Sequence, residues 1–177
     1  DRFAPQQLIG IDIDPAMLAV SAQVAREHGV TATLLAGSSS RLPLESNSVD
    51  LLFCHQTFHH LVEQDEAIHE FLRVLKPGGI MLFAESTRQY IESWIIMLLF
   101  RHPMEVQRTA DEYLRIIRGA GFTLAPESVS YPYLWWSRAD LGIRERWFGI
   151  APAADREETL LNLVATKPRS GSINHTP

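Results

Sequence analysis

The sequence predicts an α/β protein, a three-layer Rossmann-like sandwich whose sheet is mainly parallel and ends in an antiparallel strand. Three observations support this fold class. Short apolar segments alternate with helical patterns through the first half of the chain, as in β-α-β units. Residues 49–54 are apolar without alternation, which is typical of a strand covered on both faces. The second half ends in strand-like segments, and residues 159–166 form the predicted antiparallel strand.

The first predicted β-α-β unit lies at the start of the chain. Residues 8–11 form its first strand, and Asp14 acts as the N-cap of a helix that has Pro15 at its first position. Apolar residues recur at helical spacing until Gly29 ends the helix, and residues 31–35 form the second strand. The apolar residues of this helix are Met17, Val20 and Val24.

The middle of the chain repeats this alternation. A serine-rich loop at residues 37–47 leads into the strand at 49–54, and the next helix begins at Asp65. The Pro-Gly-Gly sequence at residues 77–79 ends that helix with a turn, and residues 80–84 form the following strand. The apolar face of the helix consists of Ile68, Phe71, Leu72 and Leu75.

The later elements are a strongly apolar helix at residues 89–100, a second helix and a strand. Thr109 and Glu112 have the spacing of a capping box, so a helix is predicted from there to Gly119. Residues 122–130 form the predicted strand before the final one. The aromatic stretch between these two strands, predicted as a loop with a small helix, contains Tyr131, Tyr133, Trp135, Trp136 and Trp147.

Composition limits the class of protein. A chain of 177 residues that is 46% hydrophobic is expected to form one domain, residues 1–167, with a disordered tail at 168–177. The net charge of −5 gives no basic face for nucleic acid. A single cysteine, Cys54, excludes an internal disulfide and fits a reducing cytoplasm. The longest apolar run, residues 94–100, is far shorter than the roughly 20 residues that cross a bilayer, so stable membrane insertion is not expected.

Asp12 is the strongest single indication of a binding site. In nucleotide-binding α/β domains, an acid at the end of a strand accepts hydrogen bonds from both hydroxyls of a ribose. The alternatives are a solvated loop acid or a second helix cap, and we favour them less because Asp14 already supplies the cap. The glycine-rich turn that precedes such an acid by one helix is not in the sequence, which begins at Asp1. We therefore expect the domain to be incomplete at its N-terminal end.

Four motifs in order give a family resemblance. They are GIDIDPAML at residues 10–18, AGSSSRLPLESNSVDLLF at 36–53, HHL at 59–61 and RVLKPGGIMLFAE at 73–85, with a looser match of GAGF at 119–122. Together they resemble the class I S-adenosylmethionine-dependent methyltransferases, in the small-molecule branch that includes the ubiquinone and menaquinone enzymes. The resemblance implies methyl transfer to a small, apolar or aromatic acceptor, with S-adenosylhomocysteine as product.

The resemblance also implies which residues hold the methyl donor. Asp12 would hold the ribose, and Ile13 would lie against the adenine, although an isoleucine there could equally belong to the core. Ser38 departs from the family, which commonly has an acid at that position for the adenine amino group. Adenine recognition should then be weaker or use the backbone of Ser39, and a plain polar loop is the alternative. The residues expected beside the methionine moiety are His55 and Gln56.

His59 and His60 are the candidate catalytic residues. Methyl transfer from a sulfonium needs mainly proximity and orientation, and it needs a base only if the nucleophile carries a proton. A histidine can be that base near neutral pH. Neighbours on the chain cannot both face one point, so the alternative is a structural or capping role. We expect no metal site, because the two histidines lack the i, i+4 spacing of helical ligands.

The apolar segments of the second half indicate the acceptor and the partners. Residues 94–100 and 131–136 are candidates for a lid or pocket around a greasy or aromatic small molecule, and the alternatives are core packing or a homodimer contact.

Other classes fit less well. A short-chain oxidoreductase needs a tyrosine four residues before one of the two lysines, but Leu72 and Leu163 stand there. A DNA amino-methyltransferase needs an Asn or Asp followed by two prolines after the strand at 49–54, where the sequence has CHQT. The remaining alternative is a non-catalytic methyltransferase-like scaffold or subunit that has lost cofactor binding. Without the central strand such a protein would have two unpaired sheet edges, so we favour an incomplete chain.

Overall fold

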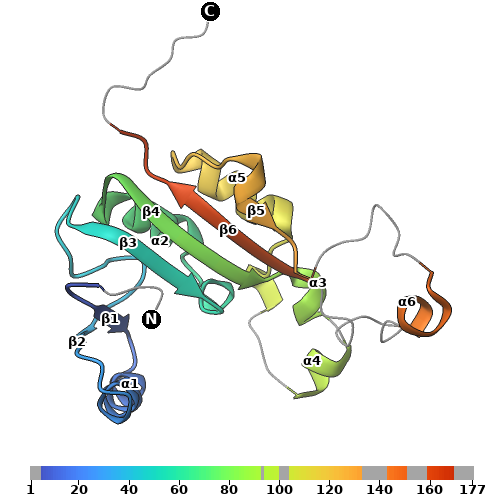
Figure 1. The fold of residues 1–177 in the computed structure, drawn as a ribbon, viewed down its shortest axis with the longest axis horizontal. Helices are drawn as coiled ribbons and strands as arrows, with labels where there is room; N and C mark the ends of the chain where they lie inside the picture. Colours follow the sequence, from blue (N-terminus) through green and yellow to red (C-terminus); the bar gives the residue numbers. More distant parts are fainter. Residues whose placement is uncertain (1–4, 93, 100–103, 133–142, 151–158, 170–177) are drawn as a thin grey trace, which may run out of the picture.

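The computed structural model describes residues 5–92, 94–99, 104–132, 143–150 and 159–169 (Figure 1). The strands are β1 Ile9–Asp12, β2 Thr33–Ala36, β3 Val49–His55, β4 Leu75–Ser86, β5 Val129–Ser130 and β6 Leu160–Thr166. The α-helices are α1 Pro15–Glu27, α2 Gln64–Val74, α3 Arg88–Ile91, α4 Trp94–Leu99, α5 Ala110–Gly119 and α6 Ile143–Phe148. Three short 3₁₀ helices are η1 Phe58–His60, η2 Met104–Val106 and η3 Pro126–Ser128.

The described strands form two sheets. β1 and β2 pair in parallel, and the second sheet has the order β3-β4-β6-β5. β3 and β4 are parallel, whereas β6 runs antiparallel to both of its neighbours. The α/β fold class and the antiparallel C-terminal strand are therefore confirmed. Within the described part of the chain, β1 pairs only with β2, and β3 pairs only with β4.

The hydrophobic core lies on one face of the four-stranded sheet, where α2 and α5 pack (Figure 1). Phe58 lies at its centre, with its ring 5.2 Å from that of Phe83 and 5.9 Å from that of Tyr113. Edge-to-face contacts of this kind stabilise aromatic clusters beyond the area they bury. Side chains on the opposite face are accessible to solvent, and Phe53 is 65% exposed. The described helices thus cover one face of this sheet.

The β1-α1-β2 unit is much less buried. Asp14 caps α1 as predicted, since its side chain accepts a hydrogen bond from the backbone N–H of Ala16 at 2.8 Å. None of the α1 residues, all of which the structure describes, is buried. The predicted apolar face is exposed to about half, with 46% for Met17, 52% for Val20 and 47% for Val24.

The loop between β2 and β3 is fastened to α2. One oxygen of Glu70 accepts a hydrogen bond from the backbone N–H of Leu42 at 2.8 Å. The Arg73 guanidinium donates to Glu70 and to the carbonyl oxygens of Leu42 and Leu44. Because Arg and carboxylate form a planar fork, these contacts fix both partners and the loop between them. They join the β1-α1-β2 unit to the larger sheet.

Lys167 caps the C-terminal end of α2. Its ammonium group lies 2.8 Å from the carbonyl oxygens of both Leu72 and Leu75, and 2.7 Å from the side-chain oxygen of Asn47. A cation at this end satisfies carbonyl groups that have no partner within the helix. Where a turn was predicted at residues 77–79 the chain is part of β4, and Gly78 there has a φ of +83°, which favours glycine.

Two predicted elements are wrong. The helix at residues 89–100 is interrupted after Ile91, and α3 and α4 are separate helices. The strand at 122–130 is mostly irregular, because Pro126 begins a 3₁₀ turn and leaves a two-residue strand after it. Parts of the predicted aromatic loop and of the tail, residues 133–142 and 170–177, lie outside the described residues. Among the helices that the structure describes, none combines the length and apolarity that crossing a membrane requires.

Candidate functional site

Asp12 ends β1, and its carboxylate is oriented by the chain that follows. One carboxylate oxygen accepts a hydrogen bond from the backbone N–H of Asp14 at 2.8 Å. Among the described residues no other hydrogen bond to this side chain is found, so the second oxygen is available as an acceptor. The next residue, Ile13, is 74% exposed, which excludes the core role that was its alternative. A carboxylate and an apolar side chain therefore lie side by side at the end of β1.

The loop after β2 lies beside Asp12. In the parallel register Asp12 pairs with Ala36, and the backbone N–H of Gly37 donates to the Asp12 carbonyl oxygen at 3.1 Å. The Ser38 hydroxyl lies 2.8 Å from that of Ser40, within a turn that the Arg41 N–H closes onto the Ser38 carbonyl oxygen. Ser38 thus uses its hydroxyl locally, while Ser39 occupies the turn itself. The structure brings Asp12, Ile13 and this serine turn to one sheet edge.

His55 and Gln56 lie at the carboxyl end of β3. The His55 ring is exposed and stacks on the ring of Phe53, with centroids 5.7 Å apart. Gln56 has a φ of +51°, a conformation that costs free energy for any residue with a side chain. Its N–H donates to the Ala84 carbonyl oxygen, and its side-chain oxygen accepts from the Ser86 hydroxyl at 2.6 Å. The chain turns sharply here, at the edge where ligands bind in open α/β sheets.

Glu85 is a buried acid at this edge that the sequence prediction missed. Its carboxylate is fully buried at the end of β4 and accepts hydrogen bonds from the backbone N–H groups of Thr57 and Phe58 at 2.8 and 2.9 Å. Its second oxygen lies 2.7 Å from Nδ1 of His59. A buried carboxylate is tolerated only with such partners. The sequence did contain a signal for Glu85, because an acid at the end of an apolar strand had already drawn attention to Asp12.

The thiol beside Glu85 is not a nucleophile. Cys54 Sγ lies 3.6 Å from a Glu85 oxygen. Burial, followed by the neighbouring Glu85 carboxylate, raises the pKa of the Cys54 thiol far above its ordinary value. Burial and Glu85 raise the pKa of the Tyr113 hydroxyl in the same way. Both groups therefore stay protonated near neutral pH, and neither is an anion there.

The structure distinguishes the two candidate histidines by their burial. His59 is 3% exposed and contacts Glu85, whereas His60 is exposed. Their ring centroids lie 4.0 Å apart. Only His60 is accessible to a substrate that arrives from solvent. No group of three or more potential metal ligands is found among the described residues.

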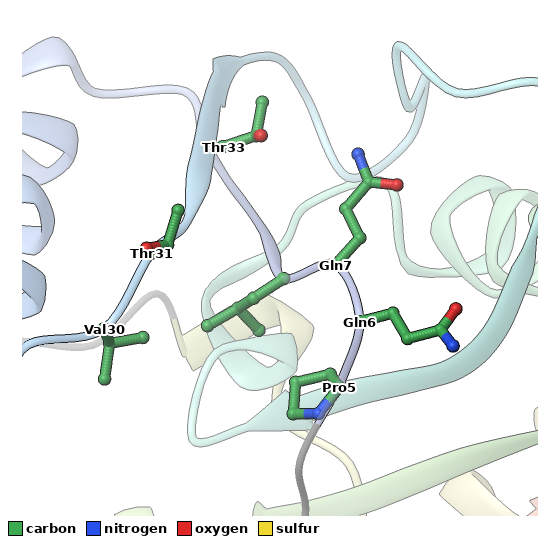
Figure 2. Close-up of a pocket in the computed structure, with 7 residues that line it drawn as sticks. Pro5, Gln6, Gln7, Val30, Thr31 and Thr33 are labelled. Carbon is green, nitrogen blue, oxygen red and sulfur yellow. The ribbon is translucent and has the colours of Figure 1, made fainter.

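A hollow in the structure lies at the other end of the small sheet. Residues 5–8 line it together with Val30, Thr31 and Thr33, as Figure 2 shows. These residues precede or begin β1 and β2, so the hollow lies at the amino ends of the strands, away from Asp12. Its lining includes no charged side chain, and it is not part of the candidate site.

The predicted site residues form two groups. Asp12, Ile13 and the serine turn belong to the two-stranded sheet, whereas His55 to His60 and Glu85 belong to the four-stranded sheet. Both groups lie at carboxyl ends of parallel strands. This arrangement defines the Rossmann-like class of α/β proteins that bind nucleotides and nucleosides at this edge.

Comparison with known proteins shows similarity to methyltransferases over the first half of the chain. Residues 1–83 match the family model described as "Methyltransferase domain". An uncharacterized methyltransferase-like protein of Schizosaccharomyces pombe is 38% identical over 91 residues, which are 51% of this chain and 34% of that protein. The UbiE ubiquinone/menaquinone biosynthesis C-methyltransferase of Campylobacter jejuni is 36% identical over 80 residues, 45% of this chain and 32% of the relative. The chain thus spans about a third of the length of these relatives.

Solved structures show the same fold. The [4+2]-cyclase SpnF superposes with a TM-score of 0.67 at 24% identity, over 92% of this chain and 66% of that one. Structures of S-adenosylmethionine-dependent methyltransferases share the fold as well. The resemblance to class I S-adenosylmethionine-dependent methyltransferases is confirmed: residues 1–83 match the model of a methyltransferase domain, and the fold of the described residues is similar to that of solved methyltransferases.

Proposed function

We propose that the protein transfers a methyl group from S-adenosylmethionine to a small apolar or aromatic acceptor and releases S-adenosylhomocysteine. The observation that supports this most is Asp12, a carboxylate with an available oxygen at the carboxyl end of β1. It lies within the residues that match the methyltransferase domain. A nucleoside with a vicinal diol is the ligand that this chemistry suits.

The chemistry of the first group of residues fits the nucleoside of the methyl donor. Asp12 would accept hydrogen bonds from the two ribose hydroxyls, and the exposed Ile13 side chain would cover one face of the adenine. The adenine amino group would meet the turn of Ser38 and Ser39, where hydroxyl and carbonyl oxygens are the acceptors. Because no carboxylate stands in that turn, we expect weaker adenine recognition than an acid would give.

The second group of residues, at the carboxyl ends of β3 and β4, fits the end of the methyl donor that reacts. When bound, S-adenosylmethionine supplies an electrophilic methyl group on a positively charged sulfur. His55 and Gln56 would lie beside the methionine moiety, with Gln56 held in place by its bonds to β4. His60 would accept the proton of an acceptor that carries one, whereas His59 is already engaged by Glu85.

Exposed apolar side chains support the choice of acceptor. Met97 and Leu98 of α4 are 60% and 76% exposed, and Trp147 and Phe148 of α6 are 78% and 71% exposed. Figure 1 shows both helices outside the sheet, on the side where β4 ends. A lid over a greasy substrate would use such residues, and a homodimer contact is the alternative. The homodimer and a cytoplasmic location remain predictions.

A non-catalytic scaffold is the second candidate. It is favoured by the division of the site residues between two sheets and by the exposed face of α1. A protein of this kind would keep the fold and would not bind the methyl donor.

Calorimetry with S-adenosylhomocysteine distinguishes the methyltransferase from the non-catalytic scaffold. We expect Asp12→Ala to weaken binding by at least about 30-fold, because losing hydrogen bonds to an ionised group costs about 2 kcal/mol or more. Asp14→Asn is the matched control, because asparagine caps helices as well as aspartate does. This variant should bind S-adenosylhomocysteine with the affinity of the wild type. Equal affinities of wild type and Asp12→Ala would remove Asp12 from the site. A wild-type protein that does not bind the ligand would support the scaffold.

A further inference from the structure

Glu85 has no part in the proposed function so far, yet it lies next to the loop that carries the candidate base. In the parallel register of β3 and β4, His55 pairs with Ala84. Glu85 is therefore the next residue along β4, beside the chain as it leaves β3. Side chains alternate along a strand, and Glu85 shares the buried face with Met81 and Phe83. Its carboxylate reaches the loop from the core side.

The carboxylate holds three consecutive residues of that loop. One oxygen accepts the backbone N–H groups of both Thr57 and Phe58, and the other meets Nδ1 of His59. This contact between the second carboxyl oxygen and Nδ1 fixes the orientation of the His59 ring.

The exposed histidine rests on this fixed ring. The His60 centroid lies 4.0 Å from that of His59, and the His60 backbone N–H donates to the Thr57 carbonyl oxygen at 3.1 Å. The position of the His60 imidazole therefore depends on the His59 ring and on the backbone that Glu85 holds.

Two neutral amides also fasten this turn through its backbone. Gln64 donates to the Phe58 carbonyl oxygen at 3.2 Å, and Gln107 donates to the His59 carbonyl oxygen at 3.0 Å. These bonds fix the backbone of η1, whereas the bond from Glu85 to Nδ1 also reaches the His59 ring.

We propose that Glu85 is a positioning residue that acts through His59 to hold the imidazole of His60 where it can accept a proton from the methyl acceptor. The proposal rests on the proposed function. It assigns one role to each residue: Glu85 orients, His59 transmits the orientation by packing, and His60 contacts the substrate. It also explains why a charged group is buried at the end of β4, where an apolar side chain would leave the two backbone N–H groups unpaired.

The first test is structural and needs no substrate. In protein labelled with ¹⁵N in histidine, the wild type should show His59 protonated at Nδ1 and nuclear Overhauser contacts between the His59 and His60 rings. Glu85→Ala should abolish those contacts, because it removes the carboxyl group that meets Nδ1 and both backbone N–H groups. Gln64→Ala is the matched control and should keep them. Ring contacts that persist in Glu85→Ala would overturn the proposal.

The second test uses turnover with hydroquinone as the probe acceptor, read as S-adenosylhomocysteine formed. We expect His60→Ala and Glu85→Ala each to lower kcat about 100-fold, within the usual range for a general base, with KM for S-adenosylmethionine unchanged. The double variant should be no slower than His60→Ala. Losses that multiply in the double variant would show that Glu85 does not act through His60.

A further variant keeps the test valid if Glu85→Ala does not fold. His59→Asn can still donate an N–H to Glu85 but has no ring beneath His60, so we expect kcat to fall as in His60→Ala. Wild-type turnover in His59→Asn would contradict the proposal. Failure of the proposed function has a different signature, because the wild type would then not bind S-adenosylhomocysteine while the ring contacts still report on Glu85.

Discussion

The β1-α1-β2 unit and the four-stranded sheet follow the same strand-helix pattern, but only the second builds a core. In α5 the residues Ala110, Tyr113, Leu114 and Ile117 are buried, whereas in α1 none is. Both helices have good N-caps and apolar residues at helical spacing. Local sequence therefore specifies that each segment is a helix, and packing alone decides how much each contributes to stability.

The two regions meet through the loop that Glu70 and Arg73 hold. We infer that the four-stranded sheet with α2 and α5 supplies most of the stability, and that the β1-α1-β2 unit depends on this attachment. Four substitutions, two of them at the attachment, test that division.

The largest effect is expected in the core. Phe58 is fully buried between Phe71, Phe83 and Tyr113, so Phe58→Ala should lower the free energy of unfolding by about 3–5 kcal/mol in urea titrations. Phe53→Ala removes the same side chain from the exposed face and should cost less than about 1 kcal/mol. Similar losses for both would mean that the open face is covered in solution.

An intermediate effect is expected at the attachment. Arg73→Lys replaces a planar fork by a single ammonium group and loses hydrogen bonds to the Leu42 and Leu44 carbonyl oxygens. We expect a loss of about 1–2 kcal/mol in stability and faster amide hydrogen exchange in the loop. Faster amide hydrogen exchange in α5, and not in the loop, would show that Arg73 does not hold the loop in place.

The same pair has a pH signature. The Arg73 guanidinium, which hydrogen-bonds the Glu70 carboxylate, lowers the pKa of that carboxyl below its ordinary value. A lowered folded-state pKa contributes stability above the unfolded-state pKa, and the contribution is lost as the pH falls through the folded-state value. The stability advantage of the wild type over Glu70→Gln should therefore shrink between about pH 7 and about pH 3. An advantage that grows on acidification would contradict this assignment.

The smallest effect is expected in α1. Val20 is 52% exposed, so Val20→Ser should change the unfolding free energy by less than about 0.5 kcal/mol. Ile117→Ser at a fully buried position of α5 is the control and should cost several times more. A large loss for Val20→Ser would show that another surface covers α1 in the intact protein.

The elements that the sequence predicted well are those set by local signals. Asp14 and the Thr109–Glu112 capping box bond to backbone groups within three residues, and both begin helices as predicted. The break after Ile91 has no comparable signal, because the segment contains neither proline nor glycine. Pro126 was such a signal in the predicted strand at 122–130, and its effect was underestimated.

The candidate site was predictable only in part. Asp12 and Gln56 follow strands that can be recognised from the sequence. Glu85 acts on residues 26 to 28 positions away, and no spacing rule connects them. The distinction between His59 and His60 likewise depends on burial, which arises only when the loop packs against β4 and α2.

The position of β6 governs how the chain can be completed during synthesis. β6 lies between β4 and β5, and Lys167 just after it reaches back to the end of α2. A nascent chain that has reached residue 150 already contains α2, β4 and α5, but β4 still presents a row of unpaired amide and carbonyl groups. Until residues 160–167 leave the ribosome, that row is open to strands of other chains, so the nascent protein should depend on chaperones most before β6 emerges.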